Sequence, residues 1–121
     1  MDNNTPSAGK DTSSTGLEPN IAGALTYLLG FITGIVFLVI EKQSKFVRFH
    51  AMQSLITFGG LFVIQQVLVW GVPILGALVS LLLVPLSILV WVFLMYKAFS
   101  GEKFKLPYIG DIAEKQIEKQ A

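Results

Sequence analysis

Four polar side chains recur at helical spacing in an otherwise apolar stretch, and their types and spacing are the ones most suited to chemistry. They are His50, Gln53, Ser54 and Thr57, which share one face of a helix because residues three and four apart lie above one another. Polar groups inside a membrane are costly unless they are paired, so this face should meet other helices or a watery cavity. If it lines a pathway, the imidazole of His50 can change its charge near neutral pH. The alternative is hydrogen bonding between helices, which the position of His50 near Arg48 and the headgroups favours. The candidate polar stripe is therefore Arg48, His50, Gln53, Ser54 and Thr57.

Motifs of known catalytic and cofactor sites are absent from the sequence. It contains no Walker loop, no HExxH motif and no Rossmann fingerprint. One histidine and no cysteine leave no credible transition-metal site. An ion pump driven by a carboxylate usually carries an acid inside a span, whereas Glu41 lies at a boundary. We therefore expect no catalytic residue, no cofactor and no metal, and we expect that the protein is not an enzyme.

The elements that position the stripe are expected to be transmembrane helices. The chain has 121 residues, of which 53% are hydrophobic and 14% charged, and no charged residue occurs from Phe49 to Tyr96. Since one crossing takes roughly 20 apolar residues, this run has the length of two crossings. The sequence Trp70-Gly71-Val72-Pro73 is the expected break, because Gly and Pro interrupt helices and Trp favours the headgroup layer. A re-entrant hairpin in which neither helix fully crosses is the alternative.

A third apolar segment precedes this run, and the fold class expected is an all-α membrane protein. The predicted architecture is a bundle of three transmembrane helices with a short C-terminal amphipathic helix. The spans are predicted over residues 21–40, 49–70 and 74–96. They belong to a transmembrane domain over residues 17–99, between a disordered N-terminal tail over 1–16 and a C-terminal tail over 100–121.

The basic residues predict how these spans are oriented. Three spans place eight of the nine Lys and Arg residues on one side: Lys42, Lys45, Arg48, Lys97, Lys103, Lys105, Lys115 and Lys119. Only Lys10 would lie on the other side. The positive-inside rule then predicts a multi-pass protein of the cell membrane with the N-terminus outside and the C-terminus cytoplasmic.

Small residues at helical spacing mark two candidate packing faces. Gly30 and Gly34 form a GxxxG motif, and Gly23 lies seven residues earlier. Gly76 and Ser80 form a second small-residue face in the third predicted span. Small residues let helix backbones approach closely, which favours association where no hydrophobic effect operates. These faces predict either a seam between two copies of the chain or packing inside one copy.

Three blocks of sequence resemble a known family. They are Gly23-Ala-Leu-Thr-Tyr-Leu-Leu-Gly30, Glu41-Lys-Gln-Ser-Lys-Phe-Val-Arg-Phe-His-Ala-Met-Gln-Ser54 and Leu106-Pro-Tyr-Ile-Gly-Asp-Ile-Ala-Glu-Lys115. Together they resemble an uncharacterised family of small bacterial and archaeal multi-pass membrane proteins. That family is distantly similar to the membrane-channel subunit of the chloroplast inner-envelope protein import machinery. The resemblance implies a helical membrane domain and transfers no molecular function.

Two hypotheses for the function follow. The first is a non-enzymatic membrane protein that acts by assembly, as a homo-oligomer or with a partner in a membrane complex. The second is a small oligomeric channel or transporter related to protein translocation, with the polar stripe lining its path. The partners expected are the lipid bilayer and other membrane proteins, and we expect neither nucleic acid nor a known small-molecule ligand.

Overall fold

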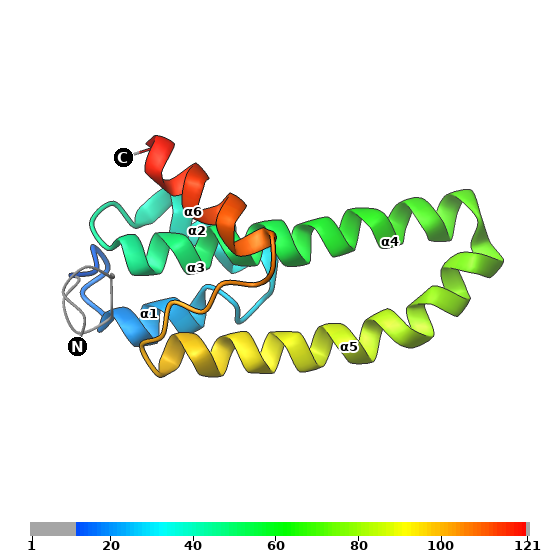
Figure 1. Ribbon diagram of the computed structural model, residues 1–121, viewed down its shortest axis with the longest axis horizontal. Coiled ribbons are helices and arrows are strands. Elements are labelled where there is room, and N and C mark those ends of the chain that lie inside the picture. The colour runs from blue at the N-terminus through cyan, green and yellow to red at the C-terminus, as the bar shows by residue number, and fades with distance from the viewer. Residues whose placement is uncertain (1–11, 121) are drawn as a thin grey trace.

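The computed structural model describes residues 12–120, and all the regular secondary structure in this part of the chain is helical. The elements are α1 (Pro19–Leu25), α2 (Phe31–Ile40), α3 (Lys45–Ser54), the π-helical turn η1 (Leu55–Gly59), α4 (Gly60–Gly71), α5 (Pro73–Phe99) and α6 (Ile109–Gln120). Figure 1 shows a long hairpin of two helices, with all the other helices gathered at its open end.

The long hairpin confirms that the charge-free run divides into two helices. The helices α3, η1 and α4 are continuous over Lys45–Gly71, and α5 follows over Pro73–Phe99. Each has 27 residues, and within the described chain these two are long and apolar enough to cross a membrane. At a rise of about 1.5 Å per residue, each is about 40 Å long, which exceeds a hydrocarbon core of about 30 Å. The break falls where Val72 leaves helical geometry and Pro73 opens α5, as the sequence predicts.

The prediction of a third span over residues 21–40 is wrong. This segment forms two short helices, α1 and α2, joined by a reversal at residues 26–30 (Figure 1). Gly30 ends the reversal with φ 62°, in the region that favours glycine. The apolar helix α2 has only 10 residues, so it extends for about 15 Å and could cover about half of the hydrocarbon core. The structure therefore has two candidate spans and a shorter apolar helical hairpin, instead of three spans.

The reversal brings the N-terminal segment back to the connector between α2 and α3. The backbone N–H of Ser14 donates to the Glu41 carboxylate at 2.7 Å, and the Ser13 hydroxyl donates to the same group. In return the Ser14 hydroxyl accepts from the backbone N–H of Lys42 at 2.9 Å. The two segments are therefore in contact, whereas three spans would place them on opposite sides of the membrane. The predicted tail over 1–16 falls mostly outside the described residues, and residues 13–16 form a turn held by Glu41.

Packing is concentrated at the open end of the hairpin. Three apolar clusters form there, built on Phe46 between α1, α2 and α3, on Phe49 between α3 and α6, and on Leu94 between α1 and α5. By contrast, none of the residues of α4, all of which the structure describes, is buried. Trp70 and Ile74 at the closed end are 81% and 79% exposed. An apolar surface of this kind is what lipid requires.

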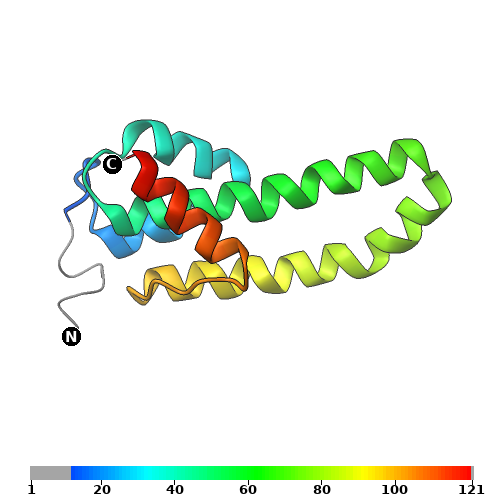
Figure 2. The same cartoon turned by 45° about the horizontal axis from the view of Figure 1, so that its top comes forward.

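The C-terminal amphipathic helix forms where the sequence predicts it and packs against α3. Ala113 and Ile117 of α6 contact Phe49 and Met52. Lys105, which precedes α6, is 2.8 Å from the carboxylate of Glu114, and Lys103 also pairs with Glu114. Figure 2 shows α6 lying across the open end of the hairpin, beside α3.

Candidate functional site

The most polar part of the interior is a chain of hydrogen bonds among Tyr27, His50 and Gln53, here called the polar cluster. The Tyr27 hydroxyl lies 2.7 Å from His50 Nδ1, and Gln53 Nε2 donates to the same hydroxyl at 2.9 Å. On the other side of its ring, His50 Nε2 lies 2.9 Å from the carbonyl oxygen of Glu102. A carbonyl oxygen only accepts, so Nε2 donates to it, and a neutral His50 accepts from Tyr27 at Nδ1. The geometry thus suits a neutral imidazole with every polar atom paired.

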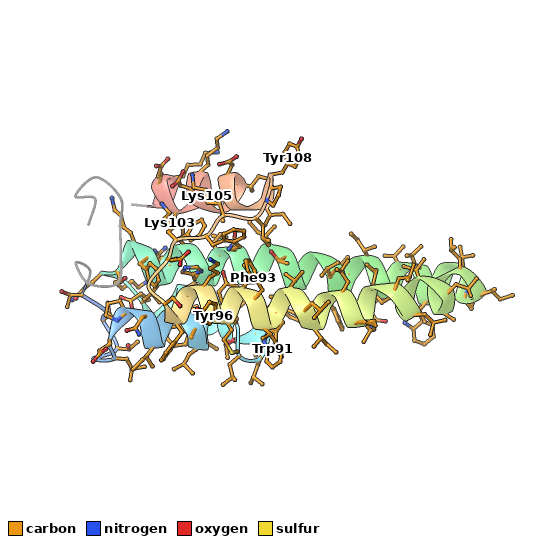
Figure 3. The ribbon with its side chains drawn as sticks, turned by 60° about the horizontal axis from the view of Figure 1, so that its bottom comes forward. Trp91, Phe93, Tyr96, Lys103, Lys105 and Tyr108 are labelled. Carbon is orange, nitrogen blue, oxygen red and sulfur yellow. The ribbon has the colours of Figure 1, made fainter. Side chains whose placement is uncertain are left out.

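The segment after α5, over residues 102–106 and here called the strap, closes over this cluster. Gln53 Nε2 donates to the carbonyl oxygen of Phe104, and Gln53 Oε1 accepts from the backbone N–H of Leu106, both at 2.9 Å. Figure 3 places Lys103 and Lys105 on the strap and Phe93 and Tyr96 on the neighbouring α5. The ring of Phe104 packs edge-on against Phe93, with centroids 5.0 Å apart. The side chain of Gln53 therefore fastens the strap to α3.

Aromatic rings complete the enclosure of His50. The rings of Phe46, Phe49 and Tyr27 meet it edge-on, with centroid distances of 4.7, 5.2 and 5.4 Å. Both His50 and Gln53 have no exposed surface. Within one chain, the polar groups of His50 and Gln53 thus face protein.

The polar groups of the reversal are satisfied by side chains from neighbouring helices. Ser54 donates to the carbonyl oxygen of Gly30 at 2.8 Å, and the indole N–H of Trp91 donates to that of Tyr27. Thr33 donates to the carbonyl oxygen of Thr26 at 3.0 Å and accepts from the backbone N–H of Leu29 at 3.2 Å. Backbone that leaves a helix at membrane depth is tolerated only where such partners replace water. The arrangement therefore allows the reversal to sit inside the membrane.

The other two residues of the predicted stripe lie apart from the polar cluster. The guanidinium of Arg48 donates to the carbonyl oxygens of Glu41 at 2.6 Å and Leu38 at 3.3 Å, at the C-terminal end of α2. The hydroxyl of Thr57 is buried and has no hydrogen-bond partner among the described residues. The structure thus pairs the side chains of His50, Gln53 and Ser54 with other segments, whereas Arg48 bonds the end of α2 and Thr57 is buried without a hydrogen-bond partner among the described residues.

The predicted small residues lie at close approaches within the chain. A Cβ on Gly34 would lie 2.8 Å from the carbonyl oxygen of Ala51, and one on Gly23 would lie 2.8 Å from the ring of Phe46. A Cβ on Gly76 would lie 2.7 Å from the backbone of Val69 in α4. Next to it, Ser80 donates to the carbonyl oxygen of Gly76 at 2.8 Å. The geometry therefore uses these faces for packing inside one copy, and α3 already covers Gly34 of the GxxxG motif.

Glu41 is a site residue that the sequence does not single out. Its carboxylate accepts hydrogen bonds from the backbone N–H of Ser14 and Ser44 and from the Ser13 hydroxyl. Burial alone would raise the pKa of Glu41, but these bonds favour the charged carboxylate and hold its pKa below the ordinary value. Tyr27 and Trp91 are two further residues whose roles the sequence did not predict: Tyr27 bonds His50 and Gln53, and Trp91 bonds the backbone of the reversal. Tyr27 lies inside the first block of family resemblance, which was the only sequence signal for it.

Comparison with known proteins identifies the chain's relatives. A UPF0132 membrane protein of Methanocaldococcus jannaschii is 55% identical over 102 residues, which cover 84% of this chain and 91% of the relative. A UPF0132 membrane protein of Archaeoglobus fulgidus is 52% identical over 101 residues, covering 84% of this chain and 97% of the relative. No solved structure is significantly similar to the chain. The model of the magnetosome magnetite crystal formation protein family matches residues 16–113. The chain therefore belongs to the magnetosome magnetite crystal formation protein family.

Proposed function

We propose that this protein is a non-enzymatic membrane protein that acts by assembling, with itself or with a partner, inside the bilayer. Its relatives are named membrane proteins, and the two long apolar helices support a location in the membrane. Among the described residues no three His, Asp or Glu side chains are placed to hold a metal ion. The proposal therefore assigns no mineral chemistry to this chain, although the family is described by magnetite crystal formation.

The observation that carries the proposal is the amide of Gln66 on the outer surface of α4. Gln66 is exposed within the charge-free run, and its side-chain amide forms no hydrogen bond with another described residue. The neighbouring Gln65 points inward, where its Nε2 donates to the carbonyl oxygen of Gly76 at 3.2 Å and to the Ser80 hydroxyl. An unpaired amide in hydrocarbon is costly, and a polar side chain on a second membrane helix would satisfy it.

The substitution Gln66→Leu tests this proposal. Hydrogen bonds between membrane helices contribute about 1 kcal/mol, so we expect the association constant to fall by roughly fivefold. Energy transfer between labelled copies in vesicles, titrated against the protein-to-lipid ratio, would measure this change. Val67→Leu is the matched control, because Val67 is 64% exposed on the same helix and carries no polar group. A wild-type protein that stays monomeric, with no partner after crosslinking in native membranes, would contradict the proposal.

We further propose that both termini face the cytoplasm. The eight Lys and Arg residues of the described chain belong to the open end of the hairpin, and the closed end around Val72 has no charge (Figure 1). The positive-inside rule then favours the open end on the cytoplasmic side. Because α1 and α2 return to the side from which they start, this orientation applies to the N-terminal segment as well.

The alternative prediction is still a channel or transporter. The resemblance to the plastid import channel suggests that it would be related to protein translocation. A groove of about 340 Å³ lies between α4 and α5, lined mainly by apolar side chains that include Phe31, Phe58 and Phe62. Such a lining suits hydrocarbon better than an ion or an extended polar chain. A conducting path would therefore have to form between copies, so this alternative also requires assembly.

A further inference from the structure

The thickness of the molecule changes along the hairpin. Near its open end, α3 and the last turns of α5 are surrounded by α1, α2 and α6. Near its closed end, α4 packs mainly against the first turns of α5. Both views of the ribbon show this difference (Figures 1 and 2). The added helices therefore lie around one half of the hairpin only.

The short hairpin of α1 and α2 has the composition of a membrane-embedded segment. No charged residue occurs between Glu18 and Glu41, which bound it. Its outer face is aliphatic and exposed: Ile32 is 53%, Val36 46% and Val39 64% exposed. In water this face would be an extended apolar patch, whereas in hydrocarbon it needs no further cover.

The depth of this short hairpin is limited to one leaflet. The 10 residues of α2 extend for about 15 Å, or about half of the hydrocarbon core. The reversal at its tip exposes Leu28 and Leu29, by 46% and 61%, while its backbone groups are bonded to Ser54, Thr33 and Trp91. An apolar tip with satisfied backbone groups can end at the bilayer centre without a cost in unpaired polar groups.

We propose that the protein is a wedge in the bilayer, which prefers curved membrane whose convex leaflet holds α1 and α2. The chain adds more cross-section to that leaflet than to the other one, where only the hairpin passes. A convex leaflet has more area per lipid near the headgroups, so inserting the extra helices there costs less free energy than in a flat bilayer. The partner of the exposed α2 face is accordingly lipid, as for other helices inserted into one leaflet. This inference does not depend on the proposed assembly.

Membrane tubes pulled from giant vesicles test the wedge directly, because the outer leaflet of a tube is convex. The chain has no cysteine, so Ser100→Cys gives a single dye position at the open end. An impermeant quencher then separates copies whose open end faces outward from copies that face inward. We expect the ratio of protein to lipid on the tube, relative to the flat vesicle, to be at least about twofold higher for outward-facing copies. Equal ratios for the two orientations would overturn the proposal.

The position of α2 in hydrocarbon is tested by a second measurement, which needs no disruptive substitution. Ile32→Cys, labelled with an environment-sensitive dye, should be quenched strongly by lipids that carry a spin label on the acyl chain. Lys42→Cys, two residues beyond α2 on the exposed connector, is the matched control and should be quenched much less. If the dye at position 32 is no better quenched than the control, then water or a second copy covers this face, and the wedge is wrong.

Discussion

Gln53 joins three parts of this molecule through a single side chain. Its amide, carried by α3, bonds Tyr27 in the reversal and both Phe104 and Leu106 in the strap. A glutamine in this position uses two donors and one acceptor at once, which no apolar residue of similar size can do. At the residue scale, the hydrogen bonds of Gln53 therefore hold together three segments that are distant in the sequence.

Replacing this amide should weaken the fold. Gln53→Leu leaves the Phe104 carbonyl, the Leu106 N–H and one side of the Tyr27 hydroxyl without their partner, and a buried unpaired group costs about 1–3 kcal/mol. We expect a loss of about 2–4 kcal/mol in unfolding free energy and faster proteolysis within the strap. Denaturation in mixed micelles measures the first effect. Gln66→Leu is the same exchange on an exposed site, and an equal loss in both variants would contradict the role given to Gln53.

The carboxylate of Glu41 predicts a pH dependence for the N-terminal turn. Its pKa in the folded protein lies below the ordinary value of 4.5, so its hydrogen bonds stabilise the turn fully above that value. This stability is lost as the pH falls below 4.5 and passes through the lowered pKa. Hydrogen exchange of residues 13–16 in lipid nanodiscs would record the loss. In Glu41→Gln the turn should be weaker at neutral pH and should no longer respond to pH in this range.

At the scale of elements, close approach of helix backbones decides where α2 can lie. Gly34 of α2 rests on the backbone of α3, and the Phe37 side chain below it joins the cluster around Phe46. These contacts of Gly34 and Phe37 explain how α2, a helix of 10 residues, stays packed against α3 without a long interface. Packing, and not propensity, holds a helix this short.

A methyl group at this contact should separate the two helices. Gly34→Ala places its Cβ 2.8 Å from the Ala51 carbonyl oxygen, a backbone atom that cannot move aside without moving α3. We expect a loss of roughly 1–3 kcal/mol in unfolding free energy. Gly60→Ala is the control, since a Cβ there meets no atom within 4 Å and alanine favours a helix. Thermal unfolding in one detergent would compare the two, and equal stability of both variants would contradict this packing.

At the scale of the whole molecule, the reversal of the first apolar segment changes the topology. A chain with two crossings has its N-terminal segment, its connector and its strap on one side, joined by Glu41 and Gln53. In the proposed topology, the turn around Val72 is the only described segment on the other side. The described basic residues lie on one side in this arrangement, as they also would with three spans, so their distribution agrees with both.

Labelling of single cysteines checks the topology. Thr12→Cys and Ser100→Cys lie on exposed positions at the open end, and Val72→Cys lies on the turn at the closed end. In intact cells an impermeant reagent should label the variant at position 72 and spare the other two. Labelling in permeabilised cells controls for reactivity. If the reagent labels position 12 from outside and does not label position 100, the topology with three spans is correct and the one proposed here is wrong.

The sequence was sufficient to predict the long hairpin and insufficient to predict the short one. A charge-free run of this length with Gly71 and Pro73 at its middle predicts two helices. Residues 21–40 have the length and hydropathy of one crossing, and a single glycine with φ 62° at position 30 decides otherwise. The stripe was predictable from its spacing, but its partners were not. Gln53 is separated from the strap by the whole of the long hairpin, and a helical pattern carries no information on so distant a contact.

The order of the segments along the chain has a consequence for how the protein is made. Gln53 and His50 enter the membrane with the first long helix, whereas the strap that binds them follows the second. Between these two moments, the amide and the imidazole lack the carbonyl and N–H groups that later pair with them. Insertion therefore passes through an immature state whose polar groups need water or an insertion factor as temporary partners. Synthesis of the strap supplies the missing partners, so the polar groups of the first long helix are fully paired only after the second long helix has been made.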